Sequence, residues 1–455
     1  MGLVKTLPVI FALICVASSC LGAGKHSAEL DRQLLAAASY GLPERIQHLL
    51  KKGASVEAKD GSSRTPLMNA VFSTNNGGNA LSCVKVLLRH HANVNAQDEW
   101  GKTPLMFASD IHVAKILLDK GAKIDAKDNE GETALLAALL NPTEQPMAQY
   151  LLTRGADPAA RTNTGGTVLL YAASSRFGRS ILPILLAKHI DLNARNRTGD
   201  TALMSAAAAS NIATIQFLLD HGALINARNN SGETALIASA HEGTAEKIAF
   251  LIHKGADVNA RNKDGETMLK LVLSNEWVTL GQVKLLLDHG ADVNQKDKDG
   301  DTALTTAMLQ GPTELARLLI THGADVNVRG SKGQTPLMLA AAYEDTEKIG
   351  LLLSHGGDVN AGDDNKATAL FYTATDHYGS ATVLEIFNTT NSGGKLGVTP
   401  DSLTGQDKIV ATNLLLSHGA DINAKDKVGK TVLAYAKAEN HPKLVAELEK
   451  AGAKE

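Results

Sequence analysis

Histidine is the residue type whose spacing in this sequence most resembles a metal site. Several of the 15 histidines recur along the chain, each directly before a glycine. They are His221, His289, His322, His355 and His418. A cation at a helix C-terminus interacts favourably with the helix dipole, and helices stacked ~10 Å apart hold successive side chains too far from one another to share an ion. These histidines are therefore interpreted as helix-ending residues, and no metal or cofactor is predicted.

Sequence motifs that would indicate catalysis are incomplete. His241-Glu242 begins like a zinc-binding helix motif, but Ala245 stands where a second histidine is required. The glycines recur at helix ends and turns, so no phosphate-binding loop is implied. A polar segment, residues 376–406, holds side chains that could act as acid and base, although such residues are common in any polar loop. They are Asp376, His377, Tyr378, Glu385 and Asp401.

Basic side chains also recur, each just before a predicted turn. They are Lys59, Lys127, Arg161, Arg195, Arg228, Arg261, Lys296, Arg329 and Lys425. A cationic line of this kind would suit an anionic partner such as lipid headgroups, an acidic protein or a sugar polymer. The alternative is that the line belongs to the repeated unit itself, because Asp or Asn usually stands beside each basic residue and weakens its field. Over the whole chain 45 Lys and Arg face 48 Asp and Glu, and the net charge of −3 argues against a nucleic-acid partner.

The N-terminal residues 1–22 are interpreted as a secretory signal peptide. Lys5 precedes an apolar stretch, residues 7–16, which small residues follow. The alternative is an N-terminal membrane helix, but the uncharged stretch over residues 6–24 is marginal beside the ~20 apolar residues that a span needs. Cleavage is expected near residues 19–23, and no transmembrane helix is expected in the mature chain.

Cys20 stands at the end of this segment and raises a second hypothesis about the N-terminus. The stretch Val16-Ala17-Ser18-Ser19-Cys20 resembles a bacterial lipobox, although Ala17 replaces the Leu that is favoured there. A lipid on Cys20 would anchor the protein on a membrane, whereas ordinary cleavage after residue 22 or 23 would discard Cys20 and leave the chain unanchored. The expected location is the periplasm or cell envelope, otherwise the protein is secreted.

The elements that would position all of these residues repeat along most of the chain. Apolar residues make up 44% of the chain but aromatic residues only 4%, a composition typical of stacked helices built from Leu, Ala, Val and Ile. A Thr-x-Leu motif recurs in steps of mostly 33 to 35 residues. Its threonines are Thr65, Thr103, Thr133, Thr167, Thr201, Thr234, Thr267, Thr302, Thr335, Thr368 and Thr431.

Each mark of the repeat predicts a local structure. Thr65-Pro66 is typical of a helix N-cap followed by the first helical residue. A second apolar-periodic helix follows, and a glycine such as Gly255 ends it. An Asx-x-x-Gly turn then leads to the next unit, as in residues 262–265. Counting the Thr-x-Leu motifs together with the helix-ending glycines gives about twelve units.

The stretch LLLDHGADVNQKDKDGDTAL, residues 285–304, resembles the ankyrin repeat family, and the resemblance extends over about residues 30–453. It implies an all-α solenoid of about twelve helix-turn-helix units with β-hairpin fingers along one edge. The fingers and first helices would form a concave face. The segment 376–406 is then an insert in repeat eleven, interpreted as a loop with a short helix over 382–387.

Two departures from the family pattern carry predictions. The family often has His after Thr-Pro-Leu, but this chain has mostly Met, Leu and Ile there. The usual polar ladder between repeats is therefore expected to be absent, with packing in its place. His91 and His189 replace the helix-ending glycine, so they are expected to adopt the left-handed conformation at some cost.

The resemblance implies protein partners bound by the finger tips and the exposed ends of the first helices. The candidate tip residues are Trp100, Arg197, Lys263, Asp264, Lys298 and Lys332, and the candidates on first helices are His241, Glu242 and Tyr343. Trp100 is emphasised because a large aromatic residue on a turn has little core to fill and Trp is enriched in interface hot spots. The alternative is that Trp100 packs against a neighbouring finger. Trp277, in a helix-helix turn, is expected to pack there.

These observations favour an exported, non-catalytic scaffold that binds proteins. One alternative is an enzyme or enzyme-associated factor that uses the insert 376–406. Another is a bacterial effector directed to a host cell, because ankyrin arrays are common in such proteins. The export-type N-terminus favours the cell envelope over the host cell.

Overall fold

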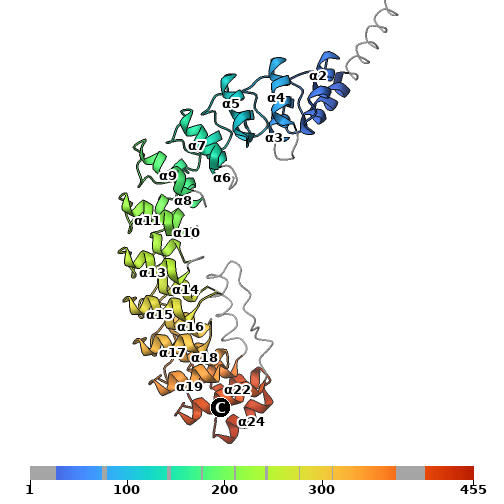
Figure 1. Ribbon diagram of the computed structural model, residues 1–455. Helices are drawn as coiled ribbons and strands as arrows, with labels where there is room; N and C mark the ends of the chain where they lie inside the picture. The colour runs from blue at the N-terminus through green and yellow to red at the C-terminus, as the bar shows by residue number, and fades with distance from the viewer. Residues whose placement is uncertain are drawn as a thin grey trace, which may run out of the picture. The chain divides into compact units, whose positions relative to one another are not determined.

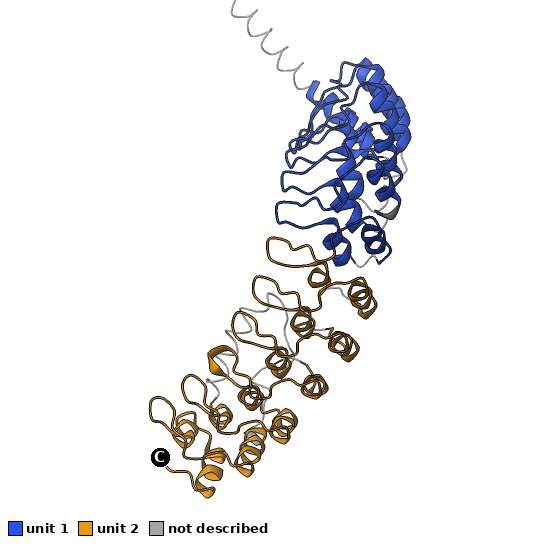
Figure 2. Ribbon diagram, turned by 90° about the vertical axis from the view of Figure 1, so that its left-hand side faces the viewer, with its two compact units in different colours: residues 1–224 blue, residues 225–455 orange. Residues whose placement is uncertain are grey.

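The computed structural model describes residues 27–73, 79–140, 145–175, 178–209, 212–240, 244–275, 277–309, 311–375 and 405–455. These residues form short helices joined by tight loops, as Figure 1 shows. Within these ranges no strand forms, and the predicted β-hairpins are reduced to isolated antiparallel bridges such as Arg161 with Thr167. The contacts divide the chain into two compact units, residues 1–224 and 225–455 (Figure 2).

Unit 1 consists of helix pairs arranged in two layers. Residues 27–39 are helical and precede the other elements. The helices are α2 (Pro43–Lys51), α3 (Pro66–Phe72), α4 (Ala80–Arg89), η2 (Pro104–Phe107), α5 (Ile111–Asp119), α6 (Ala134–Leu140), α7 (Gln145–Thr153), α8 (Val168–Ser174), α9 (Gly178–Leu186), α10 (Ala202–Ala208) and α11 (Ile212–Asp220). The first helices α3, η2, α6, α8 and α10 contact one another in chain order, and the second helices α2, α4, α5, α7, α9 and α11 do the same.

Unit 2 repeats this arrangement. Its helices are α12 (Ala235–Ala238), α13 (Ala245–His253), α14 (Met268–Leu273), α15 (Leu280–Asp288), α16 (Ala303–Leu309), α17 (Thr313–Thr321), η3 (Ser331–Gly333), α18 (Pro336–Ala342), α19 (Thr346–Ser354), α20 (Ala369–Ala374), α22 (Gly405–Ser417), α23 (Val432–Ala438) and α24 (Pro442–Lys450). The layer of first helices runs α12, α14, α16, α18, α20, α23, and the layer of second helices runs α13, α15, α17, α19, α22, α24. Together the two units confirm an all-α repeat solenoid.

The predicted helix signals act as expected. Thr167 Oγ1 accepts a hydrogen bond from the backbone N–H of Leu170 at 3.1 Å, and the same cap recurs at most of the repeat threonines. The first helices are short and apolar around most of their circumference: α18 buries Pro336, Leu337, Met338, Leu339, Ala340 and Ala341. Small and aliphatic side chains let helices pack closely on both neighbours, so few aromatic residues are needed.

The helix-ending histidines adopt the predicted left-handed backbone. The φ angle is 64° at His91 and 57° at His189, close to the αL region that glycine occupies at this place in other repeats. The prediction from the repeat pattern is confirmed. The strain at these two positions is accepted because the surrounding repeat specifies the turn.

Buried apolar residues such as Met68 and Leu136 occupy the histidine position as expected, but the repeats are also joined by polar bonds at another position. Asn259 Nδ2 donates to the carbonyl oxygen of Gly290 at 2.9 Å, and Asn259 Oδ1 accepts from the N–H of Asp292 at 2.8 Å. One amide therefore satisfies two backbone groups at the end of the next second helix, where carbonyls would otherwise lack partners. The same pair of bonds forms at Asn95, Asn193, Asn226, Asn294, Asn327 and Asn360.

The repeat that carries the insert keeps this register. Asn360 pairs with Gly419 at 3.0 Å and with Asp421 at 2.8 Å, although about sixty residues separate them in sequence. The insert residues 376–404 and the helix expected over 382–387 lie outside the described residues. The two sides of the insertion thus meet as ordinary neighbouring repeats.

Candidate interaction surface

Most of the fingers are closed by one Asx side chain, and within each unit the fingers lie along the same edge (Figure 2). Asp98 Oδ1 accepts hydrogen bonds from the N–H groups of Trp100 at 3.0 Å and Lys102 at 2.8 Å. Neighbouring fingers are joined through the backbone: the N–H of Asn129 donates to the carbonyl of Trp100 at 2.9 Å. The fingers are therefore rigid supports for the side chains at their tips.

The predicted cationic line is used to hold the fingers together. Arg161 Nη1 donates to the carbonyl oxygen of Arg195 at 3.0 Å, and Lys296 Nζ donates to the carbonyl oxygen of Arg329 at 3.0 Å. Both side chains thus reach the equivalent residue of the next finger. Arg228 and Arg261 do the same at 2.5 and 2.7 Å. These bonds favour the interpretation that the basic line belongs to the repeat itself.

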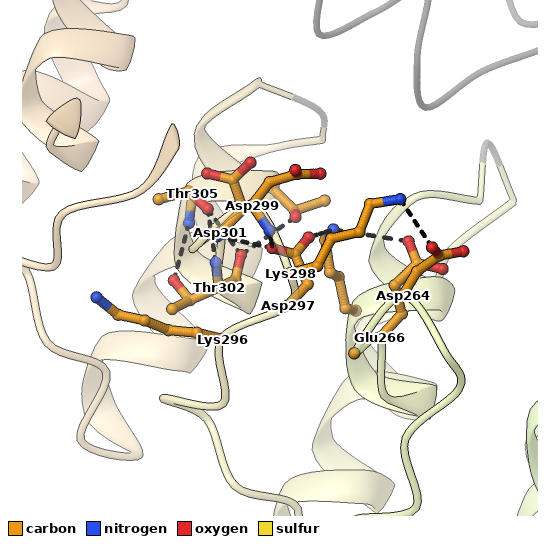
Figure 3. A network of polar contacts seen from close by, with 12 residues as sticks. Asp264, Glu266, Lys296, Asp297, Lys298, Asp299, Asp301, Thr302 and Thr305 are labelled. Carbon is orange, nitrogen blue, oxygen red and sulfur yellow. Dashed lines mark hydrogen bonds and ion pairs between the residues drawn. The ribbon is translucent and has the colours of Figure 1, made fainter. Parts of the chain in front are cut away.

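Most of the predicted tip residues are exposed, but two of them pair with each other. Arg197, Lys263 and Lys332 are exposed. Lys298 Nζ lies 2.7 Å from Asp264 Oδ1 on the preceding finger (Figure 3). The hydrogen bond from Lys298 to Asp264 raises the pKa of this lysine. An exposed pair of this kind contributes little to stability, because water screens both charges.

Trp100 lies beside an arginine of the preceding finger and remains 45% exposed. The guanidinium carbon of Arg64 is 5.4 Å from the centre of the indole ring, within cation–π distance. Trp100 therefore packs against the neighbouring finger, as one interpretation expected, and its ring still exposes surface to solvent.

Sequence reasoning missed the residues that surround Arg64. The rings of Phe72 and Phe107 lie 5.7 and 5.2 Å from the same guanidinium carbon, and the two rings meet edge to face with centroids 6.1 Å apart. We call Arg64, Phe72, Trp100 and Phe107 the Arg64 cluster. A signal was present, because Phe72 and Phe107 both end a first helix in successive repeats, in a chain that is poor in aromatic residues.

A buried lysine replaces the family histidine in one repeat and restores a polar tie there. Lys270 Nζ lies 3.6 Å from Glu266 Oε1 and forms a short ion pair with Asp297 of the next finger. Asp297 closes its own finger turn, accepting from the N–H groups of Asp299 and Asp301, both at 2.9 Å (Figure 3). Burial raises the pKa of Asp301. The ion pairs of Lys270 with Glu266 and Asp297 therefore join the fingers to the first helix.

The regularly spaced histidines cap their own helices. His289 Nδ1 lies 2.8 Å from the carbonyl oxygen of Leu285, one turn earlier, and the geometry requires the proton on Nδ1. The same contact recurs at His221, His322, His355 and His418. Over the described ranges, no group of three His, Cys, Asp or Glu side chains is placed to hold a metal ion.

Comparison with known families identifies the repeat. Models of ankyrin repeats in three copies match residues 34–128, 72–162, 109–196, 169–262 and 250–330, and the model of a single ankyrin repeat matches residues 332–364. The chain belongs to the ankyrin repeat family. A search of curated proteins found no match.

The remaining candidates are placed unevenly on the ankyrin repeats. Tyr343 is the C-cap residue of α18 and is partly buried, which raises the pKa of its hydroxyl to about 12. His241 and Glu242 lie outside the described residues, as do residues 1–26 with Cys20. Among the residues that the structure describes, no helix has the length and apolar character needed to span a membrane.

The expectation that Trp277 packs in its helix-helix turn is wrong. Its side chain is 81% exposed in this ankyrin repeat, and its backbone N–H donates to Asn275 Oδ1 at 3.0 Å. The turn is closed by its own asparagine, so the indole is not needed to fill a core there. Trp277 therefore serves as a matched exposed tryptophan for experiments on Trp100.

Proposed function

We propose that this chain is an exported, non-catalytic scaffold that binds protein partners through the fingers and first helices of its ankyrin repeats. Membership of a family whose repeats act in protein–protein interaction supports this proposal. The observation that carries it is a contrast: most of the repeated Asn and basic side chains are bonded to neighbouring repeats, whereas Phe72 and Trp100 keep 48% and 45% of their surface exposed. Exposed aromatic surface beside a rigid framework is typical of interaction sites.

The export part of the proposal rests on the N-terminal sequence. Lys5 and the apolar stretch over residues 7–16 support a secretory signal, and Cys20 supports lipidation. The protein would then act in the periplasm or cell envelope, lipid-anchored or free, or outside the cell. Intact-mass analysis of the mature chain decides between the forms: a lipid-modified Cys20 indicates the anchor, and a chain that starts at residue 23 or 24 refutes it.

Photocrosslinking tests the interaction surface. A photoreactive amino acid at position 100 is expected to capture a partner in the cells that make the protein. Lys115, exposed on the second helix α5, provides the matched control position in the same unit. If position 100 captures nothing that position 115 misses, the finger surface around Trp100 is not the binding face.

A further inference from the structure

The Arg64 cluster presents apolar rings around an arginine at the surface of unit 1. Phe72 ends α3, Phe107 ends η2, and Trp100 lies on the finger between them. The Arg64 side chain keeps 31% of its surface exposed. Three of the 17 aromatic residues of the chain, counted as 2 Trp, 7 Tyr and 8 Phe, therefore meet at one guanidinium.

The polar groups of the cluster are incompletely satisfied. Arg64 Nε faces Asp98 Oδ2 at 3.8 Å, which is too long for a hydrogen bond. Both atoms are buried and have no hydrogen-bond partner, and the Asp98 side chain is 0% exposed. None of the described residues accepts a hydrogen bond from Nη1 or Nη2 of Arg64. Solvent or a partner can therefore reach the outer edge of the guanidinium but not the carboxylate behind it.

Other repeats show what is missing here. In two of them a tyrosine nine positions after the turn Asp donates to the second carboxylate oxygen: Tyr372 to Asp363 at 2.9 Å, and Tyr435 to Asp426 at 2.6 Å. Phe107 stands at this place relative to Asp98, and it has no hydroxyl to donate. With Phe107 in place of a tyrosine, Asp98 Oδ2 has only the charge of Arg64 as a partner. The phenyl ring also adds apolar surface to the cluster.

We propose that the Arg64 cluster binds a carboxylate side chain of a protein partner that is flanked by apolar side chains. This inference rests on the proposed function. The carboxylate would accept two parallel hydrogen bonds from Nη1 and Nη2, the geometry that arginine favours. The apolar neighbours would cover the exposed rings of Phe72 and Trp100.

The charges around the cluster favour a single carboxylate over a polyanion. Arg64 and Asp98 together carry no net charge, so the site lacks the field that holds a nucleic acid, a phosphorylated lipid surface or a polyacidic chain. Glu99, exposed beside Trp100, adds repulsion against further negative charge. The Asp98 carboxylate is covered, so a cationic partner group would have to pair with Glu99, and the outer edge of the Arg64 guanidinium would repel it.

Peptide selection on the full chain tests the inference. A displayed library of random 12-residue peptides is selected on the wild-type protein, and the affinities of the enriched peptides are measured by fluorescence anisotropy. The cluster variants are Arg64→Gln combined with Asp98→Asn, which avoids a buried unpaired carboxylate, and Trp100→Ala. The matched controls are Arg317→Gln and Trp277→Ala, which change an exposed arginine and an exposed tryptophan of unit 2.

The expected peptides carry Asp or Glu next to Leu, Ile, Phe or Trp. Both cluster variants should weaken their binding by about tenfold or more, as for hot-spot residues, and the controls by less than about twofold. Replacing the peptide acid by its amide should weaken binding to the wild type to a similar extent but have little further effect on the double variant. Circular dichroism confirms that the variants are folded, and Arg64→Lys, which keeps the charge but loses the bidentate fork, should bind with intermediate affinity.

Three outcomes would overturn the inference in distinguishable ways. If the enriched peptides bind every cluster variant as tightly as they bind the wild type, the Arg64 cluster is not their binding site. The proposed scaffold function is then unaffected. Peptides that need the cluster but tolerate the amide would refute carboxylate recognition. A library that yields no binder to any part of the folded chain would count against both this inference and the proposed function.

Discussion

The reactivity of Cys83, which lies within the repeats, reports whether the helices around it are folded. Cys83 lies fully buried on α4, and burial, with a smaller contribution from Glu44, raises the pKa of its thiol to about 11. The thiolate is the reactive form, so roughly one thiol in a thousand is ionised at pH 8, and that one is covered. Cys83 should therefore resist iodoacetamide at pH 8 in the native chain and react rapidly in urea, as measured on the Cys83 peptide by mass spectrometry.

The same shift predicts a pH dependence of stability. The unfolded thiol loses its proton near its ordinary pKa of about 8.5, whereas the folded thiol keeps its proton up to about 11. The contribution of this group is therefore fully present below pH 8.5 and is lost as the pH rises towards 11. Tyr343 gives a similar loss at higher pH, because burial raises the pKa of its hydroxyl to about 12. The loss between pH 8.5 and 11 should shrink in Cys83→Ser, and equal slopes in the two proteins would contradict the assignment.

Single residues mark the limit of what the sequence could predict. The left-handed His91 and His189 follow from the repeat alone, because the position demands that backbone whatever residue fills it. The Arg64 cluster does not, since it depends on an absent hydroxyl at Phe107, which matters only once the finger and the helix are seen together. Trp277 is expected to pack because it lies in a helix-helix turn, but Asn275 closes that turn and Trp277 stays 81% exposed.

At the scale of elements, the ladders explain why the repeat tolerates departures from its pattern. Asn259 and its equivalents join second helices, the basic residues join fingers, and the backbone joins finger tips. The side-chain bonds use positions that carry Asn or a basic residue in most repeats, so those positions could be recognised in the sequence. Their partners could not, because a sequence repeat does not show which neighbouring backbone groups a side chain will reach.

The insert offers a test of this element-scale view. Residues 376–404 separate α20 from α22, yet Asn360 bonds to Gly419 and Asp421, and the hydroxyls of Thr373 and Thr412 lie 2.9 Å apart. Replacing residues 376–404 with a Gly-Ser linker of about six residues should therefore leave the repeats folded and raise the free energy of unfolding by about 1 to 1.5 kcal/mol, because each halving of the loop length lowers the entropic cost of closure by about 0.6 kcal/mol. Urea denaturation followed by circular dichroism measures the difference.

The control for the shortened chain is Asn360→Ala. This change removes two hydrogen bonds that tie the repeats across the insertion and should cost about 1 to 3 kcal/mol in both the full and the shortened chain. A shortened chain that loses helical signal, while Asn360→Ala is harmless, would show that the insert and not the ladder holds these repeats together.

At the scale of the whole molecule, the repeat pattern predicts one array over residues 30–453. The contacts within the chain form two compact units, residues 1–224 and 225–455, and the sequence carries no mark at this boundary. A sequence repeat reflects the contacts that each repeat makes with its immediate neighbours, so it does not show where a long array divides into compact units. The aromatic-poor composition is typical of stacked helices, whereas the arrangement of those helices in pairs follows from the resemblance to ankyrin repeats.

Stability in such a stack is a sum of local terms, and this leads to a prediction about the spread of a defect. Leu136 is fully buried in α6, and Leu136→Ala should remove about 2 to 5 kcal/mol from the repeats that it touches. Amide hydrogen exchange measured by mass spectrometry should then show lower protection from α5 to α8 and unchanged protection from α22 to α24. The exposed change Lys115→Ala on α5 is the control and should leave both regions as they are. An equal loss of protection in α6 and in α24 would mean that the coupling between repeats is strong enough for the chain to unfold as one cooperative body, and it would contradict the local spread predicted here.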